Sequence, residues 1–412
     1  MRVDFDALRY PVMTEDTRKA FRLLFPCLVS TGMGQAMLFA ILPPAAREIG
    51  LSSIEVSTIF VVSAVFWAFT SPSWGRLSDR VGRRRVILIG LLGYGLSMVL
   101  LAAVIGATLE GALTVTIAWP AMIASRCVFG AIGSATPPAA QAFVADRTGP
   151  EDRAAGVALI NAAFGVGQTL GPAAGAVLTV FGLLAPIYFS AGLAVASALV
   201  IYFWLPDSLP QKPESDRPQA RLSILDARIR PFFLLQILMQ AVRAVTMITL
   251  AFFLQDQLIL TSEETGRAAG IGFMVLAMAG LVSQLIVVQR LRPAPSLMIR
   301  GGLGAAMIGF ATLWVGDSFG IYLVGLAFLG LGLGLVRPGN AAASSLAVSA
   351  EEQGAVAGLL NAVGVTGNII GPLLGGYLHA IDPGGPVFLN LLLMAGGVVY
   401  ATIHPRIRTI PE

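Results

Sequence analysis

Charged side chains are scarce in this chain. Only 12% of its 412 residues are Asp, Glu, Lys or Arg, whereas 56% are hydrophobic. Because soluble domains carry about 25% charged residues, this composition excludes an ordinary water-soluble domain. Cysteine and histidine are equally rare, with two of each, and Cys27 and Cys127 both fall inside apolar runs. We therefore expect buried thiols and neither a disulfide nor a metal site.

Several further classes are excluded by what the chain lacks. We find no nucleophile–base pair and no phosphate-binding loop, so we predict neither an enzyme nor a cofactor-binding protein. The isoelectric point near 9.3 does not predict nucleic-acid binding, because the basic residues lie in short segments between apolar runs. The segment 1–20 is polar and mixed in charge, so no signal peptide is predicted.

What the chain does have is a series of apolar runs long enough to cross a bilayer as helices, which takes about 20 residues each. We predict an all-α membrane protein with twelve transmembrane helices, over 21–45, 54–74, 86–105, 115–143, 154–180, 183–205, 231–255, 266–288, 297–315, 319–346, 354–379 and 386–403. These form two six-helix bundles, 21–205 and 231–403. A polar linker, 206–230, joins them, and the tails are 1–20 and 404–412.

An arginine-rich segment, Gly75–Ile87, sets the predicted orientation. It holds five arginines and one aspartate between the second and third spans, and we interpret it as a short loop. Short loops rich in Lys and Arg stay in the cytoplasm, which places both termini there as well. Of the 27 Lys and Arg residues, the outer loops hold only Arg47 and Arg267. Three lie within spans: Arg126, Arg243 and Arg337.

The two halves of the chain repeat each other. The segment 161–175 aligns with 361–375 at a constant spacing of 200 residues, so that Asn161 matches Asn361. A repeat of six helices predicts two similar bundles related by an axis along the membrane normal. Transporters built from a repeat of this kind bind their substrate between the two bundles near the middle of the membrane, and they move it by rocking one bundle against the other.

Three motifs together resemble the major facilitator superfamily, and in particular its twelve-helix drug–proton antiporters. The segment 75–84, Gly-Arg-Leu-Ser-Asp-Arg-Val-Gly-Arg-Arg, is similar to the family's signature between helices two and three. The segment 126–133, Arg-Cys-Val-Phe-Gly-Ala-Ile-Gly, is similar to its motif in helix four. The segment 167–175, Gly-Gln-Thr-Leu-Gly-Pro-Ala-Ala-Gly, is similar to the helix-five motif of the drug–proton antiporters. The resemblance covers the whole membrane portion.

This resemblance implies a gating role for the motifs. Asp79 would interact with the start of the eleventh helix near Gly354, where the helix dipole favours an anion, and hold the outward-open state. Alternatively, the arginines only anchor the chain to anionic lipid. The glycines of 167–175 favour close helix packing, and a hinge at Pro172 is the second interpretation. The gating candidates are Gly75, Asp79, Arg80, Gly82, Arg83, Arg84, Gly167, Gly171, Pro172, Gly371, Pro372 and Arg337.

Polar side chains inside the predicted spans are candidates for substrate binding, because each is costly in lipid and usually faces a polar space or a partner. An arginine binds a carboxylate, phosphate or sulfate through two parallel hydrogen bonds, so Arg243 is the leading candidate and Arg126 the second. Amides often join helices instead. The full set is Arg243, Arg126, Gln35, Gln236, Gln240, Asn161, Gln168, Asn361, Asn368 and Gln141.

No Asp or Glu falls in the middle of a predicted span. Many cation exporters of the family carry such a carboxylate in helix one, where this chain has Ser30-Thr-Gly-Met-Gly-Gln35. Proton coupling normally needs a group that titrates near neutral pH, and a guanidinium does not. The candidate proton carriers are therefore the acids nearest the spans: Asp79, Asp146 and Asp256.

We accordingly predict a secondary active transporter that works by alternating access. It would export an amphipathic organic compound, anionic or zwitterionic, in exchange for protons. A proton symporter that takes up a small organic anion is one alternative. A non-transporting receptor or a lipid-moving protein on the same fold is another, because fold does not determine function. We expect a monomer in a bacterial-type cytoplasmic membrane, with a small-molecule substrate and the proton as coupling ion.

Overall fold

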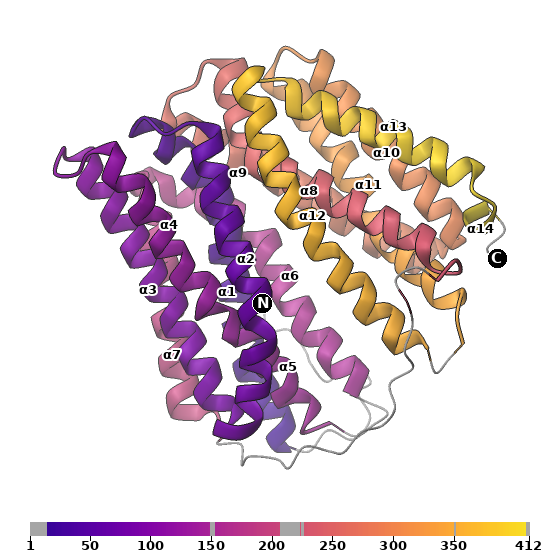
Figure 1. Cartoon of the computed structure of the whole chain (residues 1–412), viewed down its shortest axis with the longest axis horizontal. Helices are drawn as coiled ribbons and strands as arrows, with labels where there is room; N and C mark the ends of the chain where they lie inside the picture. Colours follow the sequence, from indigo (N-terminus) through magenta and orange to yellow (C-terminus); the bar gives the residue numbers. More distant parts are fainter. Residues whose placement is uncertain (1–14, 149–152, 207–222, 224–225, 350–351, 409–412) are drawn as a thin grey trace.

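The computed structural model describes residues 15–148, 153–206, 223, 226–349 and 352–408. Every regular element within these ranges is a helix, and twelve helical segments are long and apolar enough to span a membrane (Figure 1). The predicted class, an all-α membrane protein with twelve spans, is confirmed. Most of the predicted linker, 207–222 and 224–225, lies outside the described ranges.

Two groups of helices make up the molecule, and we call them the N half and the C half. The N half consists of α1 (Glu15–Glu48), α2 (Ser53–Val81), α3 (Arg83–Leu109), α4 (Val115–Ala131), η1 (Gly133–Ala135), α5 (Thr136–Ala145), α6 (Arg153–Leu178), η2 (Thr179–Phe181) and α7 (Ala185–Trp204). The C half consists of α8 (Arg230–Leu258), α9 (Ser262–Val282), η3 (Ser283–Leu291), α10 (Pro295–Val315), α11 (Phe319–Leu346), α12 (Gln353–Ile381), α13 (Gly385–Ile403) and α14 (Pro405–Arg408).

Two of the spans contain a break. The fourth combines α4, η1 and α5, and the 3₁₀ turn η1 is followed after one residue by Pro137 and Pro138, which cannot donate the backbone hydrogen bonds of a continuous helix. The eighth combines α9 with η3, where the helix widens to a π-helix at the end of the span. Both breaks shift the direction of side chains along a single span.

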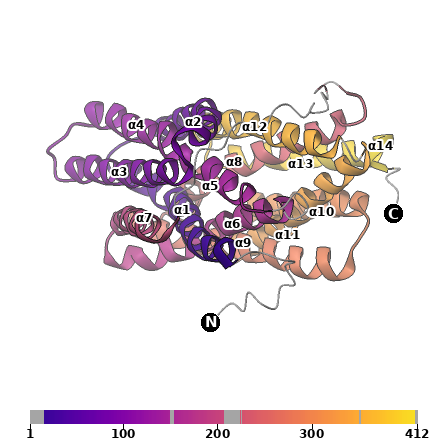
Figure 2. The same ribbon diagram turned by 90° about the horizontal axis from the view of Figure 1, so that it is seen from below.

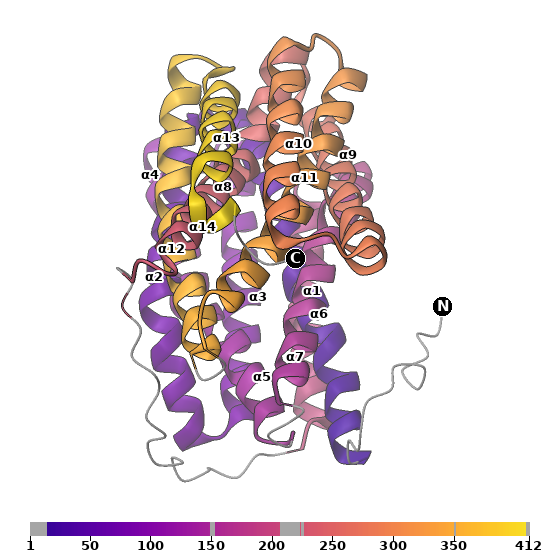
Figure 3. The same ribbon diagram turned by 90° about the vertical axis from the view of Figure 1, so that its right-hand side faces the viewer.

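The two halves lie side by side in Figures 1 and 2, and in Figure 3 the side of the C half faces the viewer. Within the N half, α1 packs against α6 and α7, and α3 packs against α7. Within the C half, α8 packs against α12, and α10 packs against α11. The halves meet where α2 contacts α12, α6 contacts α9, and α1 contacts α8 and α9.

We name the two ends of the bundle by their arginines: the basic end carries Arg83, and the distal end carries Arg47. The segment Gly75–Ile87, predicted as a loop, proves to be helical at the basic end. Helix α2 continues to Val81 and α3 begins at Arg83, so Gly82 alone makes the turn, with φ 98°. Only glycine adopts this conformation readily, whereas Gly75 lies inside α2 and makes no turn.

At the distal end the repeat extends to helix capping. Helix α2 begins with a capping box in which Ser52 and Glu55 each accept a backbone hydrogen bond from the other. Helix α9 begins with the same arrangement, formed by Thr261 and Glu264. A capping box satisfies two otherwise unpaired backbone N–H groups, so it fixes the start of each helix at the same point of the repeat.

Candidate functional site

The predicted glycine faces form close helix contacts within each half. Gly167 and Gly171 of α6 lie against the backbone of Met33 in α1, and a Cβ atom at either position would overlap it. Gly367 and Gly371 of α12 approach the backbone of Ala241 in α8 in the same way. The structure therefore places these glycines at packing interfaces, and Pro172 and Pro372 lie inside continuous helices.

Arg126 is buried inside the N half, with 3% of the residue exposed. Its guanidinium lies over the ring of Phe129, with Cζ 4.1 Å from the ring centroid, and Nη1 donates to Ser97 Oγ at 3.5 Å. Tyr94 packs edge-on against the same ring. The Nε of Arg126 has no hydrogen-bond partner, and no carboxylate of the described ranges forms an ion pair with Arg126. A buried positive charge without a carboxylate is costly and favours binding of an anion.

Arg243 lies on α8 in the C half and is partly buried. Arg337 of α11, an exposed residue, is close enough to act on it electrostatically, and both charges are positive. Arg243 also has at least one further interaction partner. The structure thus brings together two residues to which we had assigned different roles, substrate binding for Arg243 and gating for Arg337.

The predicted amides separate into two kinds. Gln141 donates from Nε2 to Asn161 Oδ1 at 2.9 Å and so joins α5 to α6, as expected of amides between helices. Gln236 and Gln240 lie against Gly364 of α12. Gln35 and Gln168 are partly buried, and the side chains of Asn361 and Asn368 lie outside the described part of the chain.

Arg83 organises the charges of the N half at the basic end. Its Nε lies 3.0 Å from Asp146, its Nη1 donates to Ser78 Oγ at 2.5 Å, and its Nη2 pairs with Asp79. Two of the three predicted proton carriers therefore share one guanidinium. Arg84 donates to the backbone carbonyl oxygen of Tyr202 in α7 and lies over its ring, while Arg80 is exposed.

The C half has its own ion-pair network at the basic end, which the sequence did not predict. Arg228 donates to both carboxylate oxygens of Glu352 at 3.0 Å and to Asp226 at 2.8 Å. It ties the segment before α8 to the start of α12. The hydrogen bonds from the Arg228 side chain hold the pKa of Asp226 and the pKa of Glu352 below their ordinary values.

The third predicted proton carrier, Asp256, lies at the distal end and bridges the two halves. Arg47 of α1 pairs with both of its carboxylate oxygens, and His379 of α12 lies 2.9 Å from Oδ2 through Nε2. The sequence did not predict this cluster.

Helices α1 and α8 occupy equivalent places in the two halves, because the paired glycines of α6 pack on Met33 and those of α12 pack on Ala241, 208 residues later. At the same spacing, the position equivalent to Arg47 is Gln255, next to Asp256.

Three arginines of the described ranges differ in which halves their ion pairs join. Those of Arg83 stay inside the N half, those of Arg228 stay inside the C half, and the pair of Arg47 with Asp256 crosses between the halves. Another contact across the distal end is the hydroxyl of Ser53, which donates to the carbonyl of Gly376. Among the described residues, polar links between the halves therefore gather at the distal end.

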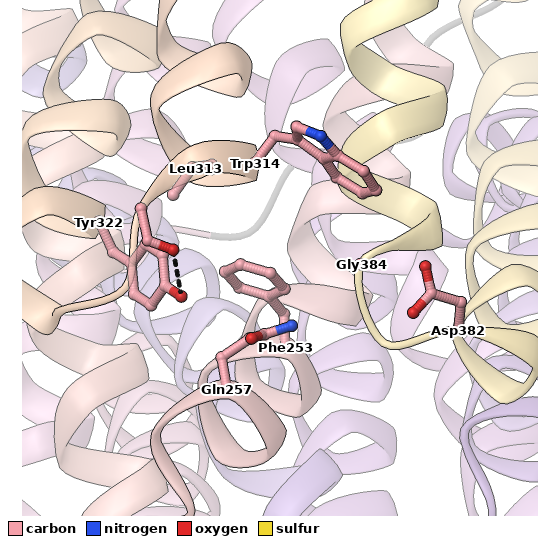
Figure 4. Close-up of a pocket in the computed structure, with 8 residues that line it drawn as sticks. Phe253, Gln257, Leu313, Trp314, Tyr322, Asp382 and Gly384 are labelled. Carbon is pink, nitrogen blue, oxygen red and sulfur yellow. Dashed lines mark hydrogen bonds between the residues drawn. The ribbon is translucent and has the colours of Figure 1, made fainter.

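A small cavity of about 140 Å³ opens at the distal end of the C half (Figure 4). Tyr322 donates from its hydroxyl to the carbonyl of Gly316, and its ring packs edge-on against Phe253. The lining residues are Phe253, Gln257, Leu313, Trp314, Gly316, Tyr322, Asp382 and Gly384. None of them is a predicted site residue. Because all belong to one half, rocking of the halves does not open or close this cavity.

Comparisons with known proteins agree with this architecture. The sequence model of the Major Facilitator Superfamily matches residues 24–372 and 232–409. The chain is 24% identical to multidrug resistance protein 2 of Bacillus subtilis over 92% of this chain and 94% of that protein. It is 28% identical to the class C tetracycline resistance protein of Escherichia coli over 91% and 93%. A bacterial homologue of the human lysosomal transporter Spinster, in an inward-facing and unoccupied conformation, superposes with a TM-score of 0.72 at 12% identity, over 96% of this chain and 98% of that one.

Proposed function

The chain belongs to the major facilitator superfamily and is an integral membrane transporter rather than an enzyme, and we propose that it exports an amphipathic organic anion or zwitterion in exchange for protons. The observation that carries the proposal is the charge inside the spans. Arg126 is buried and pairs with no carboxylate of the described ranges, and Arg243 lies close enough to Arg337 for the two positive charges to act on each other. A substrate with a negative group would bring a counter-charge to Arg126.

Export is favoured by the names of the relatives, a multidrug resistance protein and a tetracycline resistance protein. The amphipathic character follows from the site itself. The guanidinium of Arg126 lies on the Phe129 ring, so a polar anchor and an aromatic surface occupy one place in the N half. Ligand sites commonly combine a few polar groups with an apolar lining.

We propose that the basic end faces the cytoplasm, because segments rich in Lys and Arg are retained there. In that orientation the contacts between the halves close the outer side, and the conformation is inward-facing. The halves 21–205 and 231–403 are then the moving units, and the setting is a bacterial-type cytoplasmic membrane. Asp79 would leave Arg83 and reach the start of α12 only when the basic end closes.

Transport by the purified protein in proteoliposomes tests this function. We would impose a proton gradient and follow carboxyfluorescein as the organic anion and ethidium as the organic cation. We expect gradient-driven movement of carboxyfluorescein, lost in Arg126→Gln and kept in the exposed control Arg290→Gln. Movement of ethidium alone would contradict the anion assignment, and transport that ignores the gradient would contradict proton coupling.

A further inference from the structure

The distal end holds one carboxylate that two cations share. Asp256 lies near the end of α8, and Arg47 reaches it from the last turn of α1 in the other half. Arg47 also donates to Gln255 Oε1 at 3.4 Å, and its Cζ lies 5.2 Å from the centroid of the Phe252 ring. The bond between Arg47 and Asp256 is the ion pair that joins the two halves. Its strength therefore affects whether the distal end stays closed.

His379 is the second partner of Asp256, and it comes from the same half. Its side chain is 2% exposed, and its ring lies 5.4 Å from the ring of Phe252. While Nε2 lies 2.9 Å from Asp256 Oδ2, Nδ1 is buried and has no hydrogen-bond partner among the described residues. The imidazole is therefore held on the carboxylate by one nitrogen, and the other can accept a proton.

A proton on His379 acts differently on the two bonds of Asp256. A neutral imidazole leaves the negative charge of the carboxylate to Arg47. A protonated imidazole strengthens its own bond to Asp256, which stays within the C half, and repels the guanidinium of Arg47. Protonation thus weakens the bond between the halves and keeps the bond within one half.

Within the part of the chain that the structure describes, no other charged group takes part in this balance. The charged groups that face Asp256 are Arg47 from α1 and His379 from α12. Helix α2 contributes the hydroxyl of Ser53, which is bound to the backbone of α12. Glu48, next to Arg47, is exposed and forms no ion pair in the described ranges.

We infer that Asp256 and His379 form a proton-binding site whose occupancy releases Arg47 and opens the distal end. The inference rests on the proposed function, which places this end outside the cell and the protons at higher activity there. External protons then favour the outward-facing state, and closing the distal end brings Arg47 back and expels the proton. A ligand that binds one state better shifts the population toward that state, and the proton is such a ligand here.

A buried position between the halves can report opening without any substrate. Ser57 of α2 is 0% exposed and lies against Gly376 of α12, so a cysteine there reacts with a maleimide only when the distal end opens. We would place Ser57→Cys in a background with Cys27→Ala and Cys127→Ala, in nanodiscs. Ala112→Cys, exposed after α3 at the same end, corrects for the pH dependence of thiol reactivity itself.

We expect the corrected labelling rate of Ser57→Cys to rise about fivefold or more between pH 8 and pH 5.5, the lower end of usual coupling between sites. His379→Gln should label slowly at both pH values. With Asp256→Asn or His379→Arg, the cysteine at position 57 should label fast at both pH values. Asp256→Asn removes the carboxylate that pairs with Arg47, and His379→Arg places a permanent positive charge beside it. Melting temperature and gel filtration establish that each variant is folded.

The inference is overturned if His379→Gln keeps the full pH response, or if labelling in the parent does not change with pH. Because labelling needs neither substrate nor gradient, it separates this inference from the proposed function. A protein that transports carboxyfluorescein with a proton gradient yet labels independently of pH retains the function and loses this gate. A protein with the gate but without gradient-driven transport loses the function alone.

Discussion

Gln35 of α1 and Arg243 of α8 occupy equivalent positions in the two halves. Gln35 lies two residues after Met33, the residue of α1 against which the glycines of α6 pack. Arg243 lies two residues after Ala241, the residue of α8 against which the glycines of α12 pack. The repeat therefore carries a neutral amide on one side and a guanidinium on the other. A guanidinium binds a carboxylate through two parallel hydrogen bonds, so at this pair of equivalent positions an anionic group is expected beside α8 and a neutral polar contact beside α1.

Asp79→Asn tests the role of the arginine-rich segment. We expect transport to fall about fivefold or more while expression and melting temperature stay close to wild type. Arg83 keeps its bond to Asp146 in this variant, so the N half remains tied together, whereas the interaction expected at the start of α12 loses its charge. Proteoliposome transport measures the effect. Arg85→Gln, exposed in the same segment, is the control, and wild-type transport by Asp79→Asn would refute the gating role.

Gly171→Val tests the close contact of α6 with α1. A side chain at this position would overlap the carbonyl oxygen of Met33, so we expect a loss of stability of about 1–3 kcal/mol or a failure to fold. Gly165→Ala is the matched control, because a Cβ atom at Gly165 meets no other atom within 4 Å. Thermal unfolding in detergent distinguishes the two. Equal melting temperatures would contradict the packing role.

Arg228→Gln tests the ion-pair network at the basic end of the C half. The lowered pKa values of Asp226 and Glu352 mean that these carboxylates stabilise the folded state above their ordinary pKa range and lose that contribution as acid protonates them. We expect Arg228→Gln to melt below wild type at pH 7, with the difference shrinking below about pH 4. A difference that is constant with pH would contradict this assignment.

The spans and their order could be predicted from the sequence because they depend on local composition, the length of each apolar run and the breakers between runs. The arginine-rich segment was predicted wrongly as a loop. Helix propensity continues through it, and Gly82 alone interrupts the helix. That no carboxylate of the described residues pairs with Arg126 agrees with the sequence, in which no acid falls in the middle of a predicted span.

Clusters that combine distant helices were beyond prediction. Arg47, Asp256 and His379 belong to three helices, and their meeting depends on how the distal ends of the halves pack. The alignment at a spacing of 200 residues relates α6 to α12, but α1 and α8 are related at 208, so one spacing does not find both. Arg228 and Glu352 are similarly joined only by the fold.

Ligand-induced thermal stabilisation tests the central claim, an arginine-based anion site, most directly. A ligand at 100 times its dissociation constant stabilises the folded state by about 2.7 kcal/mol, which a melting curve resolves. We would compare matched panels of organic anions and lipophilic cations on wild type, Arg243→Gln, Arg126→Gln and the control Arg290→Gln. The account predicts that anions raise the melting temperature of wild type and of the control, and that Arg243→Gln loses the shift. Stabilisation by cations alone, or an unchanged anion shift in both site variants, would contradict it.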